Sequence, residues 1–224
     1  MLFTSIATRI EGRKHDDLLR QKGGRGYPTL AIMDAAGEVL TRDIDRNNAG
    51  IEKAVQSALD YARLQKRREA GEDVLAEQFF LTQLRLRMLS VDEAQRGLES
   101  YGKKLVAKDV GEASSLILAL EIEVWRSQMG RDKGAALNKG CYEAFKAGRS
   151  PVSGSRADEY LFYRPVLVGA GHADDLATFE KAFRIQAARL QKTIDGAKAR
   201  GRESYAQRQL DSLNGVLARL RKLK

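Results

Sequence analysis

Cysteine is nearly absent from this sequence of 224 residues, because Cys141 is the only one. A single thiol excludes a disulfide within the chain and a dithiol redox centre built from this chain alone. The spacing of Leu137, Cys141 and Phe145 places all three on one face of an expected helix. We therefore interpret Cys141 as a small buried apolar residue rather than a reactive thiol.

Proline and long apolar runs are also scarce. There are 3 prolines and no low-complexity tract, which argues against long disordered stretches. No apolar run approaches the roughly 18 residues that span a bilayer. The first residues lack the basic and apolar regions of a secretory signal. As written, the chain is expected to be cytoplasmic, or exported if an upstream segment with a signal peptide is missing.

Histidine is limited to His15 and His172. Each stands beside aspartates at an expected helix start, where solvent-exposed first-turn residues are common. A metal site needs further ligands at definite spacing, and no Ser/His/Asp grouping can be recognised. The sequence thus predicts no metal site, no cofactor and no catalytic residues.

The first part of the chain, residues 1–68, mixes strand and helix signals. "LFTSIATRI" is typical of a strand and "KHDDLLRQKGG" of a short helix ended by glycines. "TLAIMD" and "EVLTR" predict a hairpin that turns near Gly37. Apolar residues at helical spacing predict a longer helix from Ala49 or Gly50.

Residues 69–224 are expected to be helical throughout. Ser90 and Glu93 form a capping box, and "EASSLILALEIEVW" is apolar on more than one face, as in a buried helix. A short helix is predicted from Ser155, ending before Pro165. Short connections favour successive antiparallel helical hairpins. They make the array tetratricopeptide-like in architecture only, and a plain helical bundle remains the alternative.

The segment "GRGYPTLAIMDAAGEVL" resembles the thioredoxin superfamily. In that superfamily a cis-proline precedes a central strand, which Pro28 and Thr29 to Asp34 would supply here, and Gly37 would be the hairpin glycine. "AGIEKAVQSALDYA" would be the closing helix. The resemblance covers about a third of the chain and implies an incomplete thioredoxin-like unit.

The cysteine half of the superfamily's redox site is missing from this sequence. No Cys-x-x-Cys occurs, and no room remains before the expected first strand for the strand, motif and helix that carry it. The chain is then either a fragment of a longer protein or a natural protein that kept the scaffold for binding. Both explanations stay open.

The resemblance also implies a binding site around the proline. In the superfamily the backbone beside the cis-proline pairs with an extended substrate segment, which is a form of strand addition. The implied binding residues are Gly26, Tyr27, Pro28 and Thr29. Alternatively, Pro28 only shapes the loop and Tyr27 packs against a neighbour.

Positive charge is concentrated at the C-terminus. Residues 181–224 carry 12 basic and 3 acidic side chains, which equals the entire net charge of +9. This basic surface could meet an acidic protein, nucleic acid or a membrane surface, or it could be a solvated helix face. Its predicted members are Lys198, Arg200, Arg202, Arg208, Arg219, Arg221 and Lys222.

The expected fold class is α/β followed by all-α, with a partial thioredoxin-like unit at 1–68 and helical hairpins at 69–224. The leading functional hypothesis is a non-catalytic protein-binding or scaffold protein with a protein or peptide partner. A thiol–disulfide oxidoreductase family member lacking its cysteine half is the first alternative. A nucleic-acid-associated protein acting through the basic C-terminal helices is the second.

Overall fold

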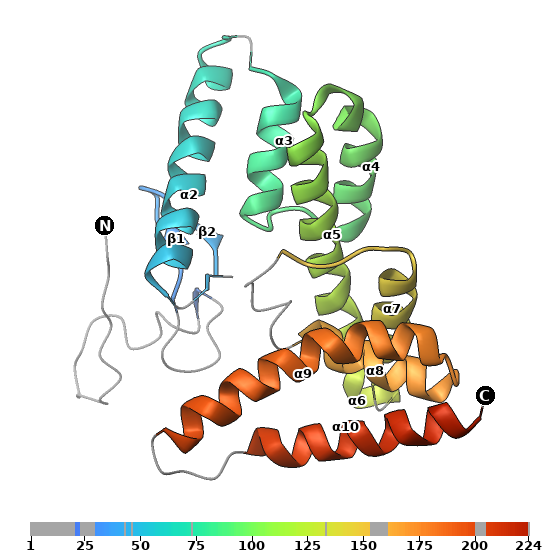
Figure 1. The fold of residues 1–224 in the computed structure, drawn as a ribbon. Coiled ribbons are helices and arrows are strands. Elements are labelled where there is room, and N and C mark those ends of the chain that lie inside the picture. Colours follow the sequence, from blue (N-terminus) through green and yellow to red (C-terminus); the bar gives the residue numbers. More distant parts are fainter. Residues whose placement is uncertain are drawn as a thin grey trace. The chain divides into compact units, whose positions relative to one another are not determined.

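The computed structural model describes residues 21–22, 30–42, 44–45, 47–72, 74–132, 134–152, 161–199 and 205–223. The chain divides into two compact units, Met1–Met88 and Leu89–Lys224, and each is described by itself. The described part is mostly helical with one small two-stranded sheet, so the all-α majority expected from the sequence is confirmed (Figure 1).

The sheet of the first unit is an antiparallel hairpin. Strand β1 (Ile32–Met33) pairs with β2 (Val39–Thr41), with Ile32 opposite Thr41. The turn between them needs a positive φ at Gly37, at 82°, and Asp34 accepts the Gly37 N–H at 3.1 Å through its carbonyl. A glycine adopts this conformation without the steric cost that other residues meet. The predicted hairpin around Gly37 is therefore confirmed.

The hairpin is followed by α2 (Asn48–Glu69) and α3 (Ala76–Arg85). The side chain of Asn47 caps α2 by accepting the Gly50 N–H at 2.8 Å. The two helices pack through Tyr61 and Phe79, whose rings stack with centroids 5.5 Å apart. The guanidinium of Arg68 on α2 lies 5.3 Å from the centre of the same Phe79 ring, which adds a cation–π contact between the two helices. The helix predicted from Ala49 or Gly50 thus exists and packs on its successor.

The second unit begins with α4 (Val91–Tyr101), the 3-10 helix η1 (Gly102–Lys104), α5 (Ala107–Ser127) and α6 (Met129–Asp132). The predicted capping box is present: Ser90 caps the Glu93 N–H, and the Glu93 carboxylate accepts the Ser90 N–H at 2.9 Å. The Ser90 hydroxyl, followed by its backbone N–H, holds the pKa of Glu93 below its usual value. Leu118 and Ile122 of α5 are fully buried, as the apolar pattern predicted.

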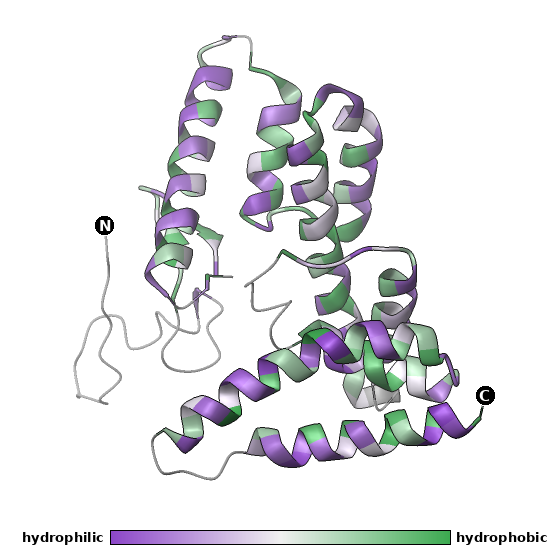
Figure 2. Ribbon diagram, viewed as in Figure 1, coloured by the Kyte–Doolittle hydropathy of each residue, from purple (hydrophilic) through white to green (hydrophobic). Residues whose placement is uncertain are grey.

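The remaining helices are α7 (Ala135–Lys146), α8 (Tyr163–His172), α9 (Leu176–Lys198) and α10 (Tyr205–Lys222). Their apolar faces form one core with α5, and α8 is its most apolar described member (Figure 2). From α7 onward each helix packs on the next one along the chain. α8 and α10 both pack on α9, so α9 lies at the centre of this group of three helices.

Contrary to the prediction from the sequence, helical structure does not end before Pro165, and the predicted helix start at Ser155 lies outside the described residues. Pro165 lies within the first turn of α8, where the backbone N–H has no partner in the helix and its loss costs nothing. Gly169 then lets α8 approach α7 closely, because an added Cβ would lie 2.6 Å from the Tyr142 Cβ and 2.8 Å from the Asn138 carbonyl oxygen. α8 is thereby set deep in the core.

Candidate binding groove

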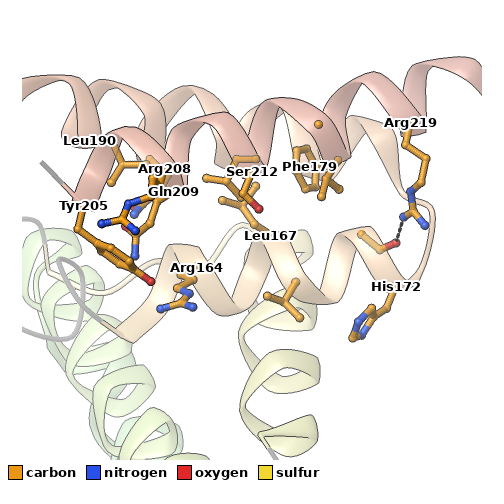
Figure 3. A pocket seen from close by; sticks show the side chains of 16 residues that line it. Arg164, Leu167, His172, Phe179, Leu190, Tyr205, Arg208, Gln209, Ser212 and Arg219 are labelled. Carbon is orange, nitrogen blue, oxygen red and sulfur yellow. Dashed lines mark hydrogen bonds between the residues drawn. The ribbon is translucent and has the colours of Figure 1, made fainter. Parts of the chain in front are cut away.

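An open groove runs between α8 and α10, and we call it the α8–α10 groove (Figure 3). Its volume is about 680 Å³, in the range of ligand-binding sites. Side chains of α8, α9 and α10 all line it. Its apolar lining consists of Leu167, Val168, Phe179, Leu190, Leu213 and Val216.

Small residues keep the groove open on the α10 side. Ser212 and Gly215 line it where larger side chains would project into it. A Cβ built on Gly215 meets nothing within 4 Å. A glycine inside a helix costs about 0.5–1 kcal/mol relative to alanine, so packing does not account for its presence at this position.

The charged groups of the groove are all potentially cationic. Arg164, Arg208, Arg219 and His172 line it, and the lining contains no aspartate or glutamate. Arg164 and Arg208 extend from α8 and α10 near the same end, beside Tyr205 (Figure 3). The Arg208 guanidinium lies 5.7 Å from the Tyr205 ring centre, and Tyr205 is 65% exposed. This end therefore combines two arginines with an accessible aromatic ring.

At the other end of the groove, two arginines attach α10 to α8 and α9. Arg219 donates from Nη2 to the Gly171 carbonyl at 2.8 Å (Figure 3). The same Nη2 lies 3.4 Å from the Asp174 carboxylate. Two residues on, Arg221 donates to the Glu180 carboxylate at 2.8 Å and 3.0 Å. These contacts hold α10 against α8 and α9, so the width of the groove is fixed at this end.

A polar cluster fixes the corner between α8 and α9. Asp175 caps α9 by accepting the Thr178 N–H at 3.0 Å and the Thr178 hydroxyl at 2.7 Å. The Tyr142 hydroxyl on α7 donates to the same carboxylate at 3.0 Å. Burial acts to raise the pKa of Asp175, but the Thr178 and Tyr142 donors outweigh it and hold that pKa below its usual value.

A second polar cluster joins α4, α5 and the end of α7. The buried Glu121 accepts the Gln95 side-chain N–H at 2.9 Å on one carboxylate oxygen. Its other oxygen lies 2.9 Å from the Arg149 guanidinium as an ion pair, without the alignment of a hydrogen bond. The carboxylate is thus held between two helices and a basic side chain.

Cys141 lies in the core on α7, with 0% of its surface exposed. Burial raises the pKa of its thiol to about 12. The thiolate is the reactive form, so almost none forms at neutral pH. The expected burial of Cys141 on a face with Leu137 is confirmed.

The implied binding residues Gly26, Tyr27, Pro28 and Thr29 lie outside the described residues, as do Arg200 and Arg202 of the basic surface. The other basic residues separate into different settings. Lys198 and Lys222 are exposed near helix ends, whereas Arg221 is bound to Glu180. Arg208 and Arg219 line the α8–α10 groove. The described basic residues of α9 and α10 therefore do not form one uniform basic face.

Other site types find no support in the part of the chain that the structure describes. Within those residues, His, Cys, Asp and Glu nowhere gather in a group of three that could hold a metal ion. The described helices are all too short or too polar to cross a membrane.

Sequence reasoning missed the α8 side of the groove. Arg164 and Leu167 were not recognised because the prediction ended the helix before Pro165. His172 was expected at a helix start, but it is the last residue of α8 and lines the groove. The signal was present in "RPVLVGAG", since a proline followed by apolar and small residues fits the first turn of a buried helix. On α10, no local pattern shows that Leu213 and Val216 line a groove shared with α8.

Comparisons with known proteins leave the chain without an assigned family: no family description, curated protein or solved structure matches it. The function has to be argued from the residues of the groove.

Proposed function

We propose that this chain is a non-catalytic protein-binding protein and that the α8–α10 groove is its partner site. The observation that carries the proposal is an open, apolar-lined groove whose charged members are all cationic. Apolar grooves rimmed by charged residues are typical sites for a segment of another protein. The buried thiol of Cys141 and the absence of any second cysteine weigh against a redox role.

We also propose a more detailed architecture for each of the two units. Helices from α7 onward that pack on their successors support a helical hairpin array in the second unit. In the first unit, the β1–β2 hairpin followed by α2 agrees with the order of elements in the resemblance to the thioredoxin superfamily. We retain an incomplete thioredoxin-like unit there as a proposal.

Nucleic-acid binding through the basic helices is the weaker candidate. Arg219 and Arg221 are already engaged by Asp174 and Glu180, which neutralise part of the basic face. Single-stranded nucleic acids need exposed aromatic rings on which bases stack, and Tyr205 is the one aromatic side chain of the lining that is largely exposed.

The test is a selection of random displayed peptides on the immobilised full chain. A Gly215→Trp variant places a bulky ring in the groove at a position with open space for a Cβ. Gly111→Trp is the matched control, because Gly111 is also a helical glycine with nothing near its Cβ, on α5. We expect peptides enriched on the wild type and on Gly111→Trp but lost on Gly215→Trp. If enrichment never depends on Gly215, the proposed site is wrong.

A further inference from the structure

The shape and charge of the α8–α10 groove also indicate what kind of segment it takes. We infer, on the basis of the proposed function, that the partner supplies an acidic amphipathic helix. Its apolar face would lie on the groove floor and its carboxylates against the arginines.

Charge gives the first argument. Arg164 and Arg208 are both exposed and line the same end of the groove, and no carboxylate lines it. Arginine binds carboxylates through a planar fork of donors, and opposite charges across an interface select partners and speed their encounter. A segment with glutamates or aspartates would supply the missing negative charge. A basic segment would place like charges together.

The second argument comes from the secondary structure of the groove walls. The walls of the groove are helices, whose backbone N–H and C=O groups bond within each helix except at the helix ends. An extended segment could not gain main-chain hydrogen bonds there, since strand addition requires a sheet edge. A helix satisfies its own backbone groups and offers an apolar stripe to a groove. The walls therefore favour a helical partner segment over an extended one.

The length of the α8–α10 groove also fits a partner helix of a few turns. On α10 the lining extends from Tyr205 to Arg219, which at the helical rise of 1.5 Å per residue is about 21 Å. A partner helix of about 14 residues matches this span. It would meet Leu213 and Val216 along its apolar face, with Arg208 beside one end.

The experiment uses the full chain and a fluorescent peptide of about 15 residues, capped at both ends, as the length of the groove requires. Leucines at its fourth, eighth and eleventh positions form one stripe, and glutamates flank them. Two control peptides have glutamine at every glutamate position, or the same composition in scrambled order. Binding is followed by fluorescence anisotropy at low and at physiological salt.

We expect the acidic helix to bind at least tenfold more tightly than either control peptide. Replacing Arg164 and Arg208 together, in Arg164→Gln with Arg208→Gln, should weaken binding more than twofold and by up to about thirtyfold, the range of two exposed ion pairs. The matched control Arg184→Gln, on α9 outside the groove lining, should change it less than twofold.

Equal binding of the acidic and the glutamine peptides would overturn the inference, as would no binding of either. The proposed function fails separately. If the peptide selection yields Gly215-dependent sequences that are neutral or basic, the groove binds proteins but not acidic helices. If it yields none, the groove is not a partner site.

Discussion

Arg219 on α10 donates a 2.8 Å hydrogen bond from Nη2 to the carbonyl oxygen of Gly171, 48 positions earlier at the end of α8. This contact holds α10 against α8 at one end of the α8–α10 groove. It also satisfies a carbonyl in the last turn of α8, where helical partners are lacking. A basic residue of the C-terminal helix thus has a structural role that its charge alone did not reveal.

Replacing Arg219 should therefore destabilise the fold modestly. We expect Arg219→Gln to lower the free energy of unfolding by about 1 kcal/mol, because a charged donor to Gly171 is lost at a solvent-exposed site. Urea unfolding measures it. Lys222→Gln, which removes an exposed charge from the same helix end, is the control and should have no effect beyond about 0.5 kcal/mol. Equal effects of the two changes would contradict a structural role for Arg219.

Gly169 should tolerate no side chain. A Cβ at this position would lie 2.6 Å from Tyr142 and 2.8 Å from the Asn138 backbone, so Gly169→Ala must push α8 away from α7. We expect a loss of about 1–3 kcal/mol in the free energy of unfolding, typical of overpacking. In contrast, Gly111→Ala, with open space, should stabilise α5 by about 0.5–1 kcal/mol. Thermal unfolding of both variants decides the matter, and a stable Gly169→Ala protein would disprove the close contact.

The charge of Asp175 should stabilise the fold above acidic pH. Its folded-state pKa is lowered, so the native state binds fewer protons than the unfolded state near that pKa. The benefit is complete above the unfolded value of about 4 and disappears as the pH falls through the folded value. Asparagine still caps a helix through its amide oxygen, but its Nδ2 cannot accept the hydroxyl bonds from Tyr142 and Thr178, so Asp175→Asn removes the charge together with those two bonds. The stability difference between wild type and Asp175→Asn should shrink below about pH 4. A difference that stays constant or grows toward pH 3 would show that the charge is not responsible.

The Cys141 thiol should react only when the protein unfolds. Its pKa of about 12 and its full burial leave neither thiolate nor access at pH 8. We expect negligible labelling by a thiol reagent in the native state and complete labelling in urea. Fast labelling with unchanged circular dichroism would place Cys141 in an accessible, reactive setting instead.

Features that depend on neighbours in sequence could be predicted from the residues. The capping box of Ser90 and Glu93, the turn at Gly37 and the burial of Leu118 each follow from a local pattern. The groove depends on packing between α8 and α10, whose lining residues are up to 55 positions apart, and no local pattern encodes it. The error at Pro165 hid the α8 side of the groove, because a proline that can end a helix also fits the first turn of one.

The most direct test of the account is a map of where a bound peptide touches the chain. The peptide most enriched on the wild-type protein would be added to the isotope-labelled full chain, and backbone amide shifts followed by NMR. If the groove is the partner site, the largest shifts fall on its lining, at Leu167, Gly171, Leu213 and Gly215, and they vanish in Gly215→Trp. Shifts concentrated on α2 or α4, with the groove residues unchanged, would contradict it.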